Sequence, residues 1–237
     1  MNRNLSIIGA AVIVSLFALT RLQSAHAENE AKRLPAPTSA PAPSATAAGL
    51  ETAVLSGGCF WGVQGVFEHV KGVEKVFAGY DGGDAATANY EAVSTGETGH
   101  AESVQIKFDP KVISYGQILN IFFSVALDPT ELNMQGPDEG TQYRSEVFYT
   151  SNTQRQIAEA YIKQLDQAKV FKKPIATRVD PDPGFFPAEN YHQDFLVRHP
   201  DHGYIVFNDL PKVENLKRLF PEFYQDEPVL ALAKAPS

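Results

Sequence analysis

Cys59 is the single cysteine in a chain of 237 residues, and glycines flank it in the stretch Gly57–Gly62. The thiolate form of cysteine is a nucleophile, so nucleophilic or redox catalysis is the chemistry this residue could perform. The alternative is that Cys59 is a buried cysteine with a purely structural role. The flanking glycines favour a reactive role, because they let other molecules approach the backbone closely.

The second candidate for chemistry is the carboxylate of Glu102. Residues 102–108 alternate between polar and apolar types, which predicts a strand with Val104, Ile106 and Phe108 on its buried face. Glu102 shares their parity, so the pattern directs its side chain towards the apolar side. A desolvated carboxyl has a raised pKa and can hold a proton near neutral pH. The alternative is that Glu102 precedes the strand and is solvated.

Two other kinds of site have weaker support. Cys59 and His192 lie at a spacing that some cysteine hydrolases use, and Asn208 could orient the imidazole, but the local hydrolase signature is absent. His199 and His202 form an i, i+3 pair without the neighbouring ligands that a zinc site requires. We therefore expect neither a hydrolase nor a metal site, and no cofactor.

The elements that must position Cys59 are a strand, a glycine turn and a helix. Ala53–Leu55 is typical of a buried strand, and apolar residues at helical spacing from Phe60 to Val70 predict a helix. Cys59 would then lie at the first turn, where free N–H groups and the helix dipole can lower a thiol pKa from about 8.5 to roughly 3.5–7.5.

Further strands and helices are expected without strict alternation along the chain. The patterns predict strands over 73–80, 102–108, 143–149 and 175–179, and helices that begin near 114, 152 and 214. The aromatic and proline-rich region after residue 185 is expected to be irregular coil. This mixture favours an α+β domain over a doubly wound sheet.

The ends of the chain differ in composition from its middle. Residues 1–27 combine Arg3, an apolar run and an Ala-x-Ala pattern, which predicts a secretory signal peptide and export to the periplasm. An uncleaved membrane anchor is the alternative. Residues 28–49 are rich in Ala, Pro and Ser and predict a flexible linker. Residues 50–225 are expected to form one domain, followed by a tail over 226–237.

The formal net charge of −8 disfavours nucleic acid and anionic membrane surfaces as partners. Exported domains often carry disulfides, but one cysteine cannot form a disulfide within the chain.

The chain resembles the peptide methionine sulfoxide reductases of the A type. The core of the resemblance is Gly58-Cys59-Phe60-Trp61-Gly62. Three further motifs follow in the expected order, and these are Thr98–Glu102, Asp138–Ser145 and Pro187–Gln193. The resemblance implies a two-layer α+β sandwich related to the ferredoxin-like plait, with a mixed sheet, helices on one side and a long irregular C-terminal coil.

The resemblance also implies a role for each site residue. Cys59 would attack the sulfoxide sulfur, and Glu102 would supply a proton to the oxygen. Tyr90 and Tyr143 would hold that oxygen through their hydroxyls. The substrate-binding residues would be Phe60 and Trp61 around the methyl group and Asp138 at the backbone amide. The family acts on the S epimer of methionine sulfoxide, free or in proteins, and leaves the cysteine as a sulfenic acid.

The chain departs from the family at two positions where many members carry further cysteines, here Ser94 and Ile205. We therefore expect an external reductant, either a small thiol or a thioredoxin-like protein, to reduce the sulfenic acid. The expected task is repair of oxidised exported proteins by a monomer. A sensor of oxidants, or a domain that binds oxidised methionine without turnover, is the remaining alternative.

Overall fold

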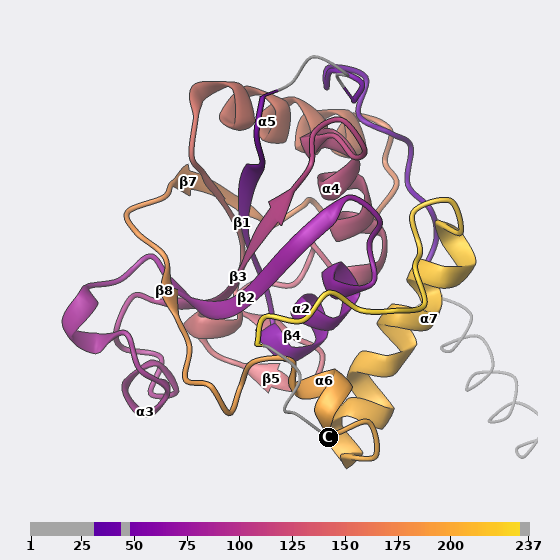
Figure 1. The fold of residues 1–237 in the computed structure, drawn as a ribbon. Helices are drawn as coiled ribbons and strands as arrows, with labels where there is room; N and C mark the ends of the chain where they lie inside the picture. The colour runs from indigo at the N-terminus through magenta and orange to yellow at the C-terminus, as the bar shows by residue number, and fades with distance from the viewer. Residues whose placement is uncertain (1–30, 44–47, 233–237) are drawn as a thin grey trace, which may run out of the picture. The chain divides into compact units, whose positions relative to one another are not determined.

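The computed structural model describes residues 31–43 and 48–232. From Arg33 onward the chain forms one compact unit built on a six-stranded sheet (Figure 1). The order of the strands across the sheet is β7-β6-β1-β3-β2-β8. Their bounds are β1 Glu51–Gly57, β2 Val73–Asp81, β3 Ala101–Phe108, β6 Ser145–Tyr149, β7 Arg178–Pro181 and β8 Phe186–Pro187.

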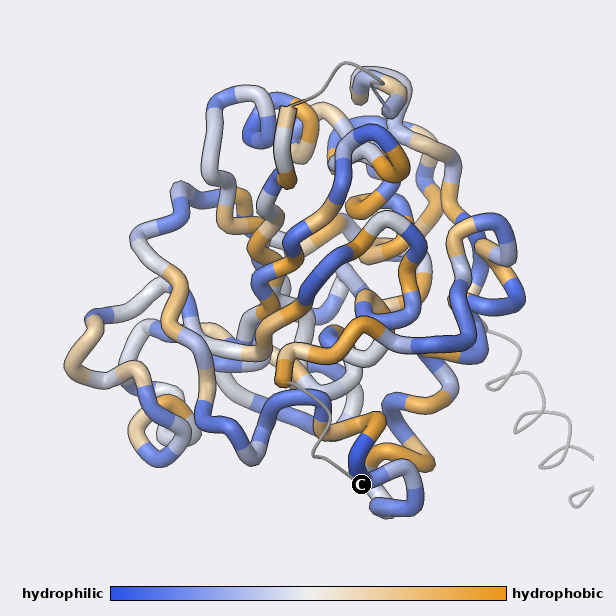
Figure 2. Tube along the Cα trace, in the orientation of Figure 1, coloured by the Kyte–Doolittle hydropathy of each residue, from blue (hydrophilic) through white to orange (hydrophobic). Residues whose placement is uncertain are grey.

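Strand β1 lies between β3 and β6 and pairs antiparallel with both. Strand β2 continues the antiparallel pairing on the far side of β3, whereas β6 and β7 pair in parallel. The sheet is therefore mixed, as the sequence predicts. Its two faces follow from the alternation of side chains, because Ala53 and Leu55 enter the main core and Val54 enters a small second cluster. Figure 2 shows where hydrophobic and hydrophilic residues follow one another along the chain.

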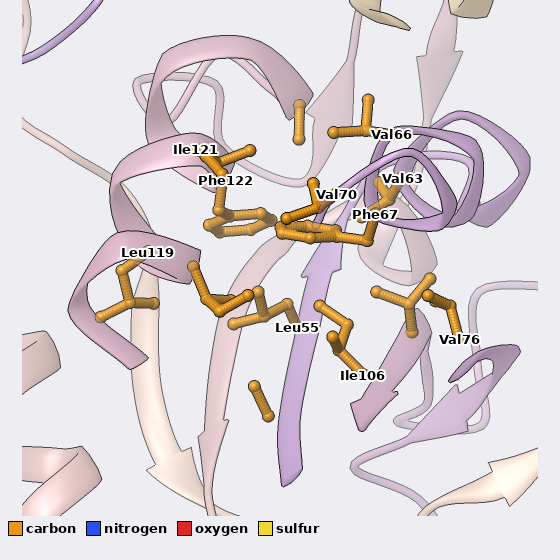
Figure 3. Packing of buried hydrophobic residues seen from close by; sticks show 14 of the residues in the cluster. Leu55, Val63, Val66, Phe67, Val70, Val76, Ile106, Leu119, Ile121 and Phe122 are labelled. Atoms are coloured by element: carbon orange, nitrogen blue, oxygen red, sulfur yellow. The ribbon is translucent and has the colours of Figure 1, made fainter. Parts of the chain in front are cut away.

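One face of the sheet is covered by helices. The longer ones are α2 Phe60–Glu68, α4 Tyr115–Ile121, α5 Asn152–Gln167 and α7 Leu210–Leu219, and a π-helical turn, η2 Phe122–Ala126, extends α4. In Figure 3, Phe67 of α2 and Phe122 of η2 meet above Leu55 and Ile106 of the sheet. This packing fixes α2, and with it the residue that precedes α2, against the centre of the sheet.

Short elements complete the fold. They are the 3₁₀ turns η1 Ala85–Thr87 and η3 Thr141–Tyr143, the helices α3 Tyr90–Val93 and α6 Phe195–Arg198, and the β4–β5 hairpin, Met134–Gln135 with Asp138–Glu139. Ser114, near which the sequence predicts that a helix begins, forms a full capping box with Gln117. Helix α5 begins at Asn152, and Ser151 is its N-cap.

The prediction of a long irregular C-terminal coil is wrong for much of residues 195–213, whereas the helix predicted to begin near 214 is present as the second half of α7. This region holds α6, the π-helical turn η4 Ile205–Asp209 and α7. Val213 and Leu216 of α7 are buried against the core, so an amphipathic face supplies the stability that the local composition does not indicate.

Residues 33–43 belong to the segment expected to be a flexible linker, but they pack against the domain. We call them the N-terminal strap. Leu34 is 4% exposed, and its N–H donates to the hydroxyl of Ser124. Asn120 and Tyr161 donate to carbonyls of the strap, and the amide of Gln164 bonds both Ala36 and Thr38. Proline fixes much of the strap in an extended form, so the side chains of α4 and α5 can satisfy its backbone groups.

Replacing Leu34 with alanine is expected to lower the free energy of unfolding by about 2–4 kcal/mol, because it empties a buried site. Leu50, which is 54% exposed, provides the matched control, and its replacement should change stability by less than about 0.5 kcal/mol. Urea unfolding of both variants measures the difference. Equal stabilities would show that the strap does not contribute to the folded domain.

Within the described residues, no helix is long and apolar enough to cross a membrane. The expected signal peptide at residues 1–27 lies outside the described residues.

Candidate active site

Cys59 is the N-cap residue of α2 and follows directly on the end of β1. The predicted order of strand, glycine turn and helix is therefore confirmed. Gly58 has φ +85°, a left-handed conformation that glycine adopts without strain. This turn sets Cys59 at the end of the central strand β1, where the residue is 8% exposed.

The glycines around Cys59 make room for the chain itself. A Cβ atom at Gly58 would lie 2.5 Å from Cβ of Gln135, in the β4–β5 hairpin. A Cβ at Gly62 would lie 2.0 Å from Oδ1 of Asp209, and one at Gly65 would lie 2.6 Å from Leu196. The sequence suggested that these glycines let another molecule approach the backbone. In the structure, three segments of the same chain occupy the space beside them, and this close packing already explains why glycine is needed there.

Replacing Gly58 with alanine is expected to destabilise the protein by about 3 kcal/mol or more and to displace the β4–β5 hairpin. Gly136 is the matched control, since it also has positive φ but a Cβ there meets nothing within 4 Å. Its alanine variant should lose only about 1 kcal/mol. Thermal unfolding compares the two, and equal losses would mean that backbone strain alone matters at Gly58.

The pKa of Cys59 is raised well above its ordinary value. Burial is the largest cause, and the negative charges of Glu102 and Asp209 raise it further. The backbone N–H of Trp61 and the ammonium of Lys212 act in the opposite direction. The prediction of a lowered pKa is therefore wrong for the free protein, because desolvation and two nearby carboxylates outweigh the helix N-terminus.

Glu102 is buried, as the strand parity predicts, with 4% of its surface exposed. Its Oε2 accepts a hydrogen bond of 3.0 Å from the N–H of Phe60, the residue after Cys59. Burial raises the pKa of Glu102 to about 8, against this hydrogen bond, which lowers it. A protonated carboxyl at neutral pH thus lies beside the nucleophile.

Tyr143 and Asp138 approach the same point from another part of the chain. Tyr143 ends the η3 turn, and burial raises the pKa of its hydroxyl, with further contributions from the charges of Glu102, Asp138, Cys59 and Tyr90. Glu102, Asp138, Cys59 and Tyr90 therefore lie within electrostatic reach of Tyr143, although the five residues come from four separate segments. Sequence order alone could not show this convergence.

Tyr90 belongs to the edge of this group. It is 37% exposed, and its ring centroid lies 4.5 Å from that of His192. Its backbone N–H donates to Oε1 of Glu189, while the hydroxyl of Tyr80 donates to Oε2 of the same carboxylate. Glu189 thus links the start of helix α3, which carries Tyr90, to strand β2.

Phe60 and Trp61 form an aromatic cluster with His192. Phe60 is 1% exposed and packs between Tyr80 and His192. Trp61 stacks on Phe195 with centroids 3.9 Å apart, and its indole N–H donates to Nδ1 of His192. The indole is thereby fixed in orientation beside Cys59.

Three residues near Cys59 were not among the sequence candidates. The hydroxyl of Tyr204 donates to Oδ2 of Asp138, and burial and the charge of Cys59 raise the pKa of this tyrosine. Asp209 and Lys212 form an ion pair of 3.2 Å at the first turn of α2. All three follow Cys59 by more than 140 positions, and no local pattern distinguishes them from surface residues.

The arrangement does not assemble the cysteine hydrolase that the sequence left open. Nδ1 of His192 accepts from Trp61, and its Nε2 is buried without a hydrogen-bond partner in the described part of the chain. Asn208 donates to the carbonyl of Tyr204 instead of orienting His192. His199 and His202 pack around Phe195, and residues 31–43 and 48–232 contain no cluster of three metal-ligating side chains.

The two positions at which the resemblance implies cysteines have structural partners here. Ile205 is fully buried at the start of η4. The hydroxyl of Ser94 donates to the carbonyl of Tyr90 at the end of α3.

The site combines a thiol, a proton-bearing carboxyl, two phenols and an aromatic wall. This set of groups suits attack on an electrophilic atom whose leaving oxygen needs a proton.

Comparisons with known proteins agree with this chemistry. The family model for peptide methionine sulfoxide reductase matches residues 51–223. The peptide methionine sulfoxide reductase MsrA 2 of Mesorhizobium japonicum is 60% identical over 187 residues, which cover 79% of this chain and 96% of that protein. The corresponding MsrA 2 of Synechocystis is 51% identical over 179 residues, which cover 76% and 84%.

Solved structures give the same result. Reduced Mxr1 from Saccharomyces cerevisiae has a TM-score of 0.58 and 29% identity, and the match covers 70% of this chain and 92% of Mxr1. Methionine sulfoxide reductase A of Corynebacterium diphtheriae has a TM-score of 0.55 and 28% identity over 73% of this chain and 89% of its own. Sequence and structure together place the chain in the peptide methionine sulfoxide reductase family.

Proposed function

We propose that the protein is a peptide-methionine (S)-S-oxide reductase that uses external thiols. The observation that carries the proposal is the contact between Glu102 and the backbone of Phe60. It places a carboxyl with a pKa of about 8 beside the only cysteine. A sulfoxide needs this pair, because its sulfur accepts a thiolate only if its oxygen is protonated.

The first half of the reaction transfers one oxygen atom. The Cys59 sulfur attacks the sulfoxide sulfur while Glu102 donates its proton to the oxygen. The substrate sulfur is reduced by two electrons and leaves as methionine. The transient S–S bond and the substrate S–O bond both break, and the oxygen passes to the Cys59 sulfur. Cys59 is thereby oxidised by two electrons and is left as a sulfenic acid. Tyr90 and Tyr143 hold the oxygen through their hydroxyls during this transfer.

The substrate is held by the walls around Cys59. Phe60 and Trp61 receive the S-methyl group, and the indole has one orientation because it is bonded to His192. Asp138 binds the backbone amide of the oxidised methionine. Its hydrogen bond from Tyr204 fixes the carboxylate for this purpose and leaves lone pairs free for the substrate. We expect the S epimer to be the substrate, because membership of the peptide methionine sulfoxide reductase family implies it.

The second half of the reaction requires a reductant from outside the chain, because Cys59 has no cysteine partner. A small thiol or a thioredoxin-like protein fills this role. The N-terminal pattern of residues 1–27 supports export, so we assign the protein to the periplasm and to the repair of exported proteins during oxidative stress. Because the N-terminal strap packs against the domain, less of the linker is available to let the domain reach distant substrates. We expect the enzyme to act as a monomer.

Turnover of matched sulfoxide epimers tests the proposal. The protein lacking residues 1–27 should reduce a methionine-S-sulfoxide peptide repeatedly with dithiothreitol or thioredoxin and leave the R epimer intact. The control is the same mixture with protein alkylated at Cys59. Reduction that stops after one equivalent with every thiol would contradict enzymatic turnover and favour the oxidant sensor.

A further inference from the structure

The ion pair of Asp209 and Lys212 lies directly beside the proposed nucleophile. Oδ1 of Asp209 and Nζ of Lys212 would lie 2.0 and 2.9 Å from a Cβ atom at Gly62, three residues after Cys59 on α2. Asp209 is fully buried, whereas the Lys212 side chain is 22% exposed. The inner member of the pair is therefore the carboxylate, and the member that reaches solvent is the ammonium.

The position of the ammonium is fixed by the buried carboxylate. Residues 203–219 form one continuous helical stretch, with η4 leading directly into α7, so Asp209 and Lys212 lie on neighbouring turns of the same face. Oδ1 of Asp209 pairs with Nζ of Lys212 at 3.2 Å. The buried carboxylate thus holds the ammonium beside α2.

The surroundings of Cys59 are otherwise acidic. Glu102 and Asp209 raise the pKa of the thiol, Asp138 adds to the raised pKa of Glu102, and the whole chain carries a net charge of −8. Lys212 is the cation that lowers the pKa of Cys59. An approaching anion meets repulsion from the carboxylates and attraction from this ammonium.

The reductant of the proposed reaction arrives as such an anion. The thiolate of a donor attacks the Cys59 sulfenic acid, an S–S bond forms and the S–O bond breaks. The leaving hydroxide takes a proton from solvent and departs as water. A second donor thiol then attacks the donor sulfur of this mixed disulfide. Cys59 leaves as the thiol, and the two donor molecules leave as their disulfide. The donor is oxidised by two electrons in total.

We propose that Lys212 receives the external thiol donor and that Asp209 holds the ammonium for this contact. The inference rests on the proposed function, and it names the preferred class of donor as an anionic thiol. This class consists of small thiols that carry a carboxylate near the sulfur. Lys212 is then a binding residue for the second half of the reaction, and Asp209 is its positioning residue.

The test compares donors of different charge on the isolated second half-reaction. The sulfenic form is prepared with one equivalent of S-sulfoxide peptide and mixed with mercaptoacetate, 2-mercaptoethanol or cysteamine, and loss of the sulfenic acid is followed by intact mass. Lys212→Met should lower the second-order rate constant for mercaptoacetate roughly tenfold relative to that for cysteamine. Lys212→Arg should keep the preference of the wild type.

Lys217→Met is the matched control, because Lys217 lies on the same helix and its exposed side chain pairs with Asp226. It should leave the ratio of the donors unchanged. Equal changes with all three donors, or none, in Lys212→Met would overturn the inference. Failure of the wild type to form any sulfenic acid would instead contradict the proposed function, so the two failures are distinguishable.

Discussion

The Cys59→Ser variant is expected to lose sulfoxide reduction by at least about 10⁴-fold, the largest effect of any single change. A serine hydroxyl is a far weaker nucleophile and cannot take up the oxygen as a sulfenic acid. No other cysteine exists to substitute for it. The measurement is the yield of reduced peptide in a single turnover, with thermal unfolding to confirm that the variant folds.

Cys59 is 8% exposed and lies within the main core, so serine changes little in volume there. The fold should therefore survive, and substrate binding should remain measurable by titration with the sulfoxide peptide. Residual reduction above about 1% of the wild-type rate would show that Cys59 is not the nucleophile.

Replacing Glu102 with glutamine is expected to lower the single-turnover rate by about 10²–10⁴-fold, because the amide cannot protonate the sulfoxide oxygen. The hydrogen bond from Phe60 can be kept, since the amide oxygen also accepts. In the wild type the rate should fall as pH rises through about 8, where Glu102 loses its proton. The variant should lack this decline, and a decline that persisted would assign it to another group.

The same substitution should stabilise the folded protein at high pH. The pKa of Glu102 rises from 4.5 to about 8 on folding, so the folded state keeps a proton that the unfolded state releases. Stability is therefore lost as pH rises from about 4.5 to 8, by roughly 3 kcal/mol at pH 7. Glu102→Gln should unfold at a higher temperature than the wild type at pH 8 and at a similar temperature at pH 4.

Much of the fold follows from the sequence because hydrophobic alternation and helix caps are local. The burial of Glu102 is the clearest example, since its parity with Val104 and Ile106 predicts the face on which it lies. The capping box of α4 is another, because Ser114 and Gln117 are only three residues apart.

The remainder depends on contacts between distant segments. The N-terminal strap has the composition of a linker, and only the side chains of α4 and α5 hold it in place. The pKa of Cys59 depends on Asp209, which the sequence does not connect with it. The three glycines of the stretch Gly57–Gly62 likewise indicate close approach, but the sequence does not reveal that Phe122, Gln135 and Asp209 are the groups that approach.

The most direct test of nucleophilic oxygen transfer to Cys59 is a single turnover without reductant. The protein is mixed with excess methionine-S-sulfoxide peptide, reduced peptide is quantified, and the intact protein is weighed after trapping. The mechanism predicts one reduced peptide per protein, one oxygen atom gained at Cys59, and no reaction with the R epimer. Reduced peptide without oxidation of Cys59, or no reduced peptide while Cys59 still reacts with an alkylating reagent, would contradict it.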